Sequence, residues 1–157
     1  RNHYVGRTFI EPSKKIRSFG VKLKLSPNKT LIKKKSIILI DDSIVRGTTS
    51  IKIVKMMYEA GAKEVHLRVC APPIKHPCHL GGDMAAYSEL KAANKSIQEI
   101  GSFVGADSIG YLSIDGLLEA VKDDQDSHCT GCFTGNHPVP VQLEMNKLAL
   151  ETSTPKF

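Results

Sequence analysis

The sequence predicts an α/β fold: a parallel sheet with helices on both faces, followed by a C-terminal tail that contains cysteines. The run 36–40 is apolar after its first residue, which is typical of a central parallel strand buried on both faces. A helical pattern and a second apolar run follow within about 35 residues, and such a βαβ unit forms a right-handed parallel crossover. The 157 residues are enough for one domain with a sizeable core.

The segment before this run is predicted to contain little regular structure. Residues 1–11 are polar and are predicted to form a mobile loop. A short helix is predicted over 13–19, because a glycine follows it. Residues 21–25 alternate apolar and basic side chains, as a half-exposed strand does, and a turn is predicted at 27–28.

Helices and strands are predicted to continue after the apolar run. Thr48 begins a helix with one apolar face, and Gly61 ends it. Ser96 and Glu99 have the spacing of a capping box. The predicted elements are, in order, a helix from 48 to 60, a strand over 64–70, a helix over 88–94, a helix from 96 to about 105, a strand over 108–112 and a helix over 114–122.

Charge is unevenly distributed along the chain, whose net charge is +6. Residues 1–35 carry eleven Lys and Arg against one acidic residue. Two interpretations stay open: a solvated face, or a face for a polyanion such as nucleic acid or a polyphosphate. Few aromatic residues lie among these lysines, so a stacking platform for single-stranded nucleic acid is not supported.

Targeting signals are not visible in the sequence. No apolar run approaches the roughly 18 residues of a membrane span, and no secretory signal is seen. A cytoplasmic location is therefore expected. The chain opens on Arg1 rather than on a methionine, and we expect that an N-terminal part is missing.

Two carboxylates, Asp41 and Asp42, stand where the first apolar run ends. Ligands of open parallel sheets bind beyond the carboxyl ends of the strands. If the strand continues, the two side chains point to opposite sides and can hold different groups. A ribose diol, or a Mg²⁺ ion that bridges a diol and a pyrophosphate, would suit them.

A stretch suited to bind phosphate follows the carboxylates. Gly47 lets the backbone approach a ligand closely, and the N–H groups of a helix N-terminus attract anions. Thr48, Thr49 and Ser50 add hydroxyl donors. The P-loop pattern GxxxxGK[ST] is absent. An acidic pair alone can be a solvated loop, and a Thr/Ser run alone can be a helix cap, but their combination favours a ligand site.

The stretch IILIDDSIVRGTTS at 37–50 resembles the phosphoribosyl pyrophosphate (PRPP) motif of type I phosphoribosyltransferases. Within that group, DDSIVRGTTS is similar to the amidophosphoribosyltransferase family. NHYVGRTFI at 2–10, GAKEVHLRVCAPPIKHPC at 61–78 and the segment 100–121 resemble further parts of that family. The resemblance covers residues 1–138 and implies part of the phosphoribosyltransferase fold. Residues 139–157 are unmatched and are predicted to be helical or disordered.

The resemblance implies a reaction in which ammonia from glutamine displaces pyrophosphate from C1 of PRPP. The product is 5-phosphoribosylamine, and the step is the first committed one of purine synthesis. By this resemblance Asp41 and Asp42 hold the ribose hydroxyls and Mg²⁺. The remaining PRPP-binding residues that it implies are Ser43, Arg46, Gly47, Thr48 and Thr49. The implied assembly is a homo-oligomer that binds no nucleic acid.

Two residues of the segment 1–11 match catalytic positions of the family, Tyr4 and Arg7. In the family this segment folds over PRPP and excludes water, which would otherwise compete with ammonia. The family also has a glutaminase half, whose cysteine nucleophile has no counterpart here. The chain by itself is therefore expected to be inactive.

Three of the four cysteines have spacings that suggest a metal site. Cys129 and Cys132 form a CxxC pair, which by itself suits zinc, a redox pair or chance, and Cys78 lies between two histidines. The resemblance implies a 4Fe–4S cluster on Cys78, Cys129 and Cys132, with a fourth ligand outside this chain and residues 123–138 as the cluster-binding tail. Cys70 is predicted to be a buried small apolar residue.

Two other functions stay open at this point. A PRPP-binding regulator would keep the fold without catalysis, but it requires neither the three cysteines nor the segment at 2–10. A zinc-bound structural domain would leave the stretch at 41–50 unexplained.

Overall fold

The computed structural model describes residues 25–80, 86–122 and 127–139. The predicted mobile loop and the helix over 13–19 lie outside these residues, as do most of the strand over 21–25 and nearly all of the tail from 139 onward. The described elements are α2 (Lys29–Ile32), β1 (Ser36–Asp41), α3 (Thr48–Glu59), β2 (Glu64–Val69), the 3-10 helix η2 (Tyr87–Glu89), α4 (Lys91–Asn94), α5 (Ile97–Val104), β3 (Ser108–Tyr111), α6 (Ile114–Val121) and α7 (Gly131–Thr134).

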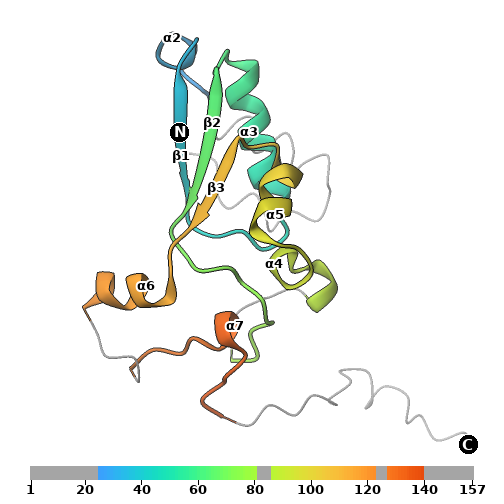
Figure 1. Ribbon diagram of the computed structural model, residues 1–157, viewed down its shortest axis with the longest axis vertical. Helices are drawn as coiled ribbons and strands as arrows, with labels where there is room; N and C mark the ends of the chain where they lie inside the picture. Colours follow the sequence, from blue (N-terminus) through green and yellow to red (C-terminus); the bar gives the residue numbers. More distant parts are fainter. Residues whose placement is uncertain (1–24, 81–85, 123–126, 140–157) are drawn as a thin grey trace, which may run out of the picture.

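The described strands form one parallel sheet in the order β1-β2-β3 (Figure 1). Asp41, Val69 and Tyr111 lie in one register row at the carboxyl ends of the three strands. The predicted βαβ unit and the α/β fold class are thus confirmed. Since ligands of such sheets bind at the carboxyl edge, this row marks the edge on which the site must be sought.

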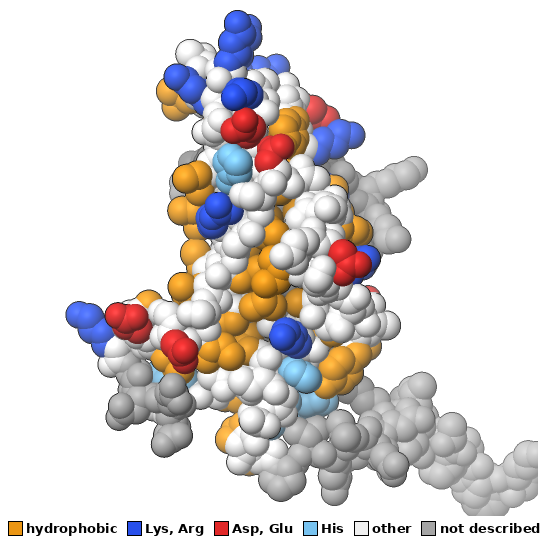
Figure 2. All heavy atoms as spheres, in the orientation of Figure 1, with side chains coloured by type: hydrophobic (Ala, Val, Ile, Leu, Met, Phe, Trp, Pro, Cys, Tyr) orange, Lys and Arg blue, Asp and Glu red, His pale blue; other side chains and the backbone are white. Residues whose placement is uncertain are grey.

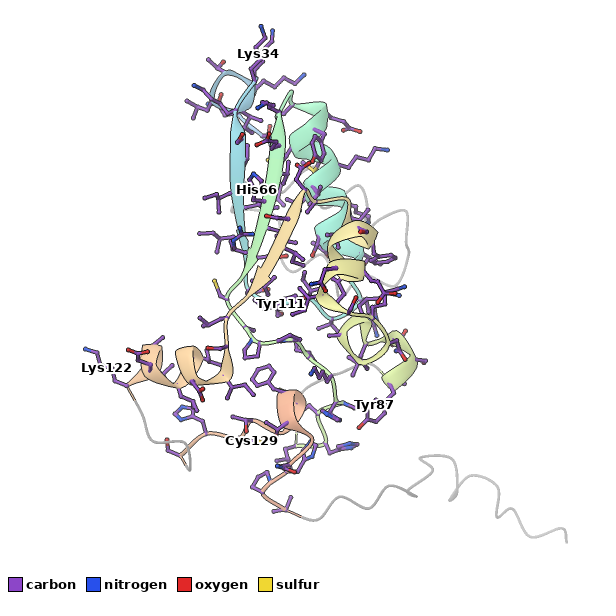
Figure 3. All side chains as sticks on the ribbon, viewed as in Figure 1. Lys34, His66, Tyr87, Tyr111, Lys122 and Cys129 are labelled. Atoms are coloured by element: carbon purple, nitrogen blue, oxygen red, sulfur yellow. The ribbon has the colours of Figure 1, made fainter. Side chains whose placement is uncertain are left out.

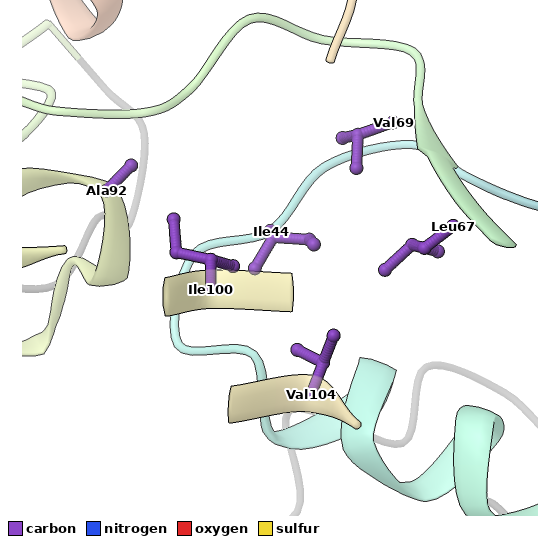
Figure 4. Close-up of a cluster of buried hydrophobic side chains, with 6 residues drawn as sticks. All are labelled: Ile44, Leu67, Val69, Ala92, Ile100 and Val104. Atoms are coloured by element: carbon purple, nitrogen blue, oxygen red, sulfur yellow. The ribbon is translucent and has the colours of Figure 1, made fainter. Parts of the chain in front are cut away.

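The core lies between one face of the sheet and the helices α3 and α5. Its buried residues come from the β1–α3 loop, β2, α4 and α5 and pack together as Figure 4 shows: Ile44, Leu67, Val69, Ala92, Ile100 and Val104. Each such side chain contributes roughly 1.5–3 kcal/mol when it is fully buried, alanine less. This packing fixes the loop that follows β1, because Ile44 is part of it.

The prediction that 36–40 is a central strand buried on both faces is wrong for the described residues. β1 is an edge strand of the described sheet, and Ile38 and Ile40 are 68 % and 69 % exposed. Among the described residues, α3 and α5 lie on the opposite face, where Leu39 packs on the core. Because every residue from 37 to 40 is apolar, the sequence showed no alternation that could distinguish the two faces.

Helix boundaries were predicted well where a cap defines them. The capping box of α5 forms, and Gly105 ends that helix in the left-handed conformation. The predicted helix over 88–94 is instead two short helices, because Leu90 is extended between them and its side chain is fully buried. α2 and α7 were not predicted; Asn28, expected in a turn, caps α2.

Lysines gather at the end of the molecule where α2 lies (Figure 2). Lys29, Lys33, Lys34 and Lys35 precede β1 and so lie at the amino end of the sheet. The carboxylates of 41–42 lie at the other end of β1. The described part of the basic segment is therefore separated from the candidate site by the length of a strand.

Candidate functional site

Asp41 is the last residue of β1 and its side chain is partly buried. Its Oδ2 accepts a hydrogen bond from the Ser50 hydroxyl at 3.1 Å, and its Oδ1 accepts one from the Asp42 N–H at 3.2 Å. Burial raises the pKa of Asp41 and the nearby Asp42 carboxylate raises it further, while the hydrogen bond from Ser50 opposes the shift. The carboxylate is therefore held in one orientation at the carboxyl edge.

Asp42 lies in a different environment from its neighbour. Its side chain is exposed, and its Oδ1 accepts hydrogen bonds from the Ser43 N–H at 2.6 Å and the Ser43 hydroxyl at 3.3 Å. The two adjacent carboxylates thus accept hydrogen bonds from different groups of the chain. That they hold different parts of a ligand stays a prediction. Ser43, predicted as a phosphate donor, uses these donors within the loop.

The loop from β1 to α3 ends at Gly47, which is the N-cap of the helix with φ +73°. This left-handed conformation favours glycine, and a Cβ here would lie 3.1 Å from Phe103 Cε1. Thr48 and Thr49 are exposed in the first turn of α3, and the N–H groups of a helix N-terminus attract anions. That this turn binds phosphate stays a prediction.

Ser50 has a different role from the one expected of it. Its side chain is buried and its hydroxyl bonds Asp41, so it orients the carboxylate rather than facing a ligand. The sequence gave no indication of this role. A Ser/Thr run at the start of a helix has the same pattern whether its side chains cap the helix, bind a ligand or orient a neighbouring side chain.

Arg46 forms an ion pair with Glu89 of η2, with Nη2 and Oε2 2.8 Å apart. The sequence did not predict this pair, because the two residues lie 43 positions apart and belong to separate elements. The Lys91 N–H also donates to the Val45 carbonyl at 3.0 Å. The segment that contains η2 and α4 therefore contacts the β1–α3 loop through both a side-chain ion pair and a backbone hydrogen bond.

The three predicted cluster cysteines are brought to one region below the sheet, where Figure 3 labels Cys129 near α7. The Cys132 carbonyl accepts hydrogen bonds from the N–H groups of Lys75 and His76, both at 3.0 Å, which joins α7 to the segment that contains Cys78. Burial raises the pKa of Cys132, and the neighbouring Cys78 and Cys129 raise it further. Three sulfur donors from two segments suit a thiolate-ligated group. Within the described residues, however, no three His, Cys, Asp or Glu side chains are already arranged to hold a metal ion.

Two predicted catalytic residues, Tyr4 and Arg7, lie outside the described residues.

The prediction that Cys70 is buried is wrong, because its side chain is exposed. β2 ends at Val69, so Cys70 stands beyond the sheet, where its N–H donates to the Asp41 carbonyl at 2.9 Å.

Comparison with known proteins connects this geometry to a family. No established family profile matches the chain. The chain is 51 % identical over 151 residues to the chloroplastic amidophosphoribosyltransferase of Glycine max and 53 % identical over 144 residues to the amidophosphoribosyltransferase of Methanocaldococcus jannaschii. These alignments cover 96 % and 92 % of this chain. The chain is homologous to one segment of the amidophosphoribosyltransferases.

A solved structure shows the same relationship in three dimensions. The glutamine PRPP amidotransferase of B. subtilis, complexed with ADP and GMP, superimposes with a TM-score of 0.76 at 45 % identity over 92 % of this chain. The chain spans 26 % and 30 % of the two relatives named above and 32 % of this structure. The amidophosphoribosyltransferase fold thus accounts for the parallel sheet and its helices.

In the described part of the chain, no helix is long and apolar enough to cross a membrane.

Proposed function

We propose that the chain forms the part of an amidophosphoribosyltransferase that binds the ribose and 5-phosphate of PRPP. The observation that carries the proposal is the pairing of Asp41 and Asp42 at the carboxyl end of β1 with the exposed Thr48 and Thr49 of α3. About half of the residues are identical to proteins of that name across this stretch of chain. The proposed reaction is displacement of pyrophosphate from C1 of PRPP by glutamine-derived ammonia, which begins purine synthesis.

The chemistry assigned to this chain is mainly positioning and electrostatics. Ser50 holds Asp41 in place, so that the two carboxylates can bind the ribose hydroxyls in a fixed orientation. The backbone around Gly47 and the hydroxyls of Thr48 and Thr49 bind the 5-phosphate at the helix N-terminus. Asp41 and Asp42 would also hold Mg²⁺, which neutralises charge on the departing pyrophosphate.

Residues 1–11 and the cysteines complete the proposal. Tyr4 and Arg7 close over PRPP and exclude water, because water would consume the activated sugar. Cys78, Cys129 and Cys132 would hold an iron–sulfur cluster that fixes the segment around α7 to the body, a structural role. The complete enzyme is a cytoplasmic homo-oligomer in this proposal, although some relatives carry chloroplastic names.

The test uses the complete gene product, assayed for 5-phosphoribosylamine with PRPP, Mg²⁺ and ammonia. Asp42→Asn should lower kcat/KM by at least about tenfold, because one carboxylate ligand of the ribose and metal is lost. Glu119→Gln on α6 is the matched control, as it removes an exposed carboxylate away from the loop. Equal activity of Asp42→Asn and wild type would refute the assignment, and PRPP binding without any product would favour a regulator instead.

A further inference from the structure

Arg46, predicted to bind PRPP, is held in the structure by a carboxylate from another part of the fold. Its guanidinium lies 2.8 Å from Glu89, and the two side chains are 56 % and 48 % exposed. Exposed ion pairs contribute little to folding, since water competes with them and ordering long side chains costs entropy. Stability therefore does not explain why these two residues meet.

The backbone beside Glu89 is anchored in the fold. Leu90 beside it is fully buried, and Asn94 Nδ2 donates to the Leu90 carbonyl at 3.0 Å. The Lys91 N–H donates to the Val45 carbonyl, one residue before the arginine. Val45 itself packs on the cluster that contains Leu90. The backbone that carries Glu89 is thus held against the loop. Figure 3 shows the neighbouring Tyr87, also on η2.

A second cation near the loop, Lys91, already has a partner. Lys91 Nζ lies 4.8 Å from the centroid of the Phe103 ring, and Phe103 packs next to Gly47. Lys91 is thus engaged in a cation–π contact. Within the loop from 42 to 47, Arg46 is the single Lys or Arg. It is the guanidinium available to an anion bound at the start of α3.

We propose that Glu89 is a positioning residue that holds Arg46 beside the phosphate loop and releases it to a phosphoryl group of PRPP. This inference rests on the function proposed above. A guanidinium binds phosphate through two parallel N–H···O bonds, and a doubly charged phosphate attracts it more strongly than an exposed carboxylate does. Glu89 competes with the ligand for Arg46, so it keeps the arginine ordered and weakens PRPP binding at the same time.

The test measures the Kd of Mg²⁺-PRPP by calorimetry on the complete gene product. Wild-type binding is established first, because its absence would overturn the proposed function together with this inference. Glu89→Gln, which keeps the shape and removes the charge, should lower the Kd about two- to fivefold. Glu89→Asp retains the charge and should stay closer to wild type. Arg46→Gln should raise the Kd at least about tenfold.

A double-mutant cycle separates exchange of the arginine from a general charge effect. In the Arg46→Gln background, Glu89→Gln should leave the Kd unchanged, because no guanidinium remains to be released. Equal tightening in both backgrounds would mean that Glu89 acts only through its long-range field, and the inference would fail. It would also fail if Glu89→Gln weakened binding, since the ion pair would then support the loop itself.

Discussion

The side chain of Asp41 is partly buried and accepts hydrogen bonds from the Asp42 N–H and the Ser50 hydroxyl. The carboxylate of Asp42 lies nearby. Its folded-state pKa is raised above the usual 3.8, chiefly by desolvation. The neutral acid is therefore favoured by folding, and this contribution to stability is complete below pH 3.8. It is lost as the pH rises through the raised pKa.

Asp41→Asn should therefore raise the melting temperature at pH 7 and have little effect near pH 3, because the wild-type side chain is then neutral as well. The same change should abolish PRPP binding, since a carboxylate ligand is removed. Thermal unfolding at several pH values measures the first effect and calorimetry measures the second. A variant that is less stable than wild type at pH 7 would contradict the raised pKa.

The role of a residue could be predicted only where it follows from the residues next to it in the sequence. The carboxylates at 41–42 and the hydroxyls at 48–49 follow an apolar run, so their place after the end of a strand could be inferred from order alone. The bond from Ser50 to Asp41 and the pair of Arg46 with Glu89 could not. Both depend on how α3 and η2 pack, which no local pattern encodes.

Gly47 begins α3 and Gly105 ends α5, and both have left-handed backbones, with φ +73° and +77°. They differ in their surroundings: a Cβ at 47 would lie 3.1 Å from Phe103, whereas no other part of the described chain lies within 4 Å of one at 105. Substitution by alanine should cost roughly 1–2 kcal/mol of unfolding free energy at Gly105, from backbone strain alone. Gly47→Ala should cost more, and urea unfolding measures both.

Phe103→Leu offers a control for this comparison. If steric contact causes the additional cost, Gly47→Ala should be less harmful in the Phe103→Leu background than in wild type. Equal costs at the two glycines would show that Phe103 moves aside freely.

Elements were predictable to the extent that their ends carry a chemical signal. The capping box at 96–99 and the glycine at 105 gave α5 its correct limits. β1 was found but assigned the wrong burial, because a uniform apolar run does not reveal how many layers cover it. The break at Leu90 has no local signal: the residue leaves the helix in order to reach the core.

The exposed face of β1 affects the whole molecule, because Ile38 and Ile40 present adjacent apolar surface to water. Exposed apolar patches of this kind promote association. The 157-residue chain alone should therefore self-associate at micromolar concentration, and Ile38→Thr with Ile40→Thr should shift it toward monomer. Sedimentation velocity measures this shift. Leu31→Thr, at an exposed leucine on α2, is the control. An unchanged distribution in the double variant would exclude this face.

The bonds from Lys75 and His76 to Cys132 join the body to α7. If an iron–sulfur cluster holds this region, chelation of iron from the anaerobically purified complete protein should speed hydrogen exchange of those two amides at least about tenfold. Amides of β2 should be unaffected, because they lie within the sheet. Unchanged hydrogen exchange after complete removal of iron would contradict the proposal that the cluster holds α7 against the rest of the fold. Zinc rather than iron in the purified protein would contradict the cluster itself.

For the molecule as a whole, order along the chain was enough to predict the parallel sheet, since βαβ units allow few arrangements. It was not enough to predict that β2, rather than β1, is the middle strand of the described sheet.

Tyr111 stands in the same register row as Asp41, and its hydroxyl is buried without a hydrogen-bond partner among the described residues. Desolvation raises its pKa to about 12. The chain has no tryptophan, so tyrosinate absorbance is readily followed in the ultraviolet. A late ionisation step near pH 12, absent in Tyr111→Phe and in the unfolded protein, would make this side chain an intrinsic optical reporter. It would report packing at the edge of the sheet where PRPP is proposed to bind.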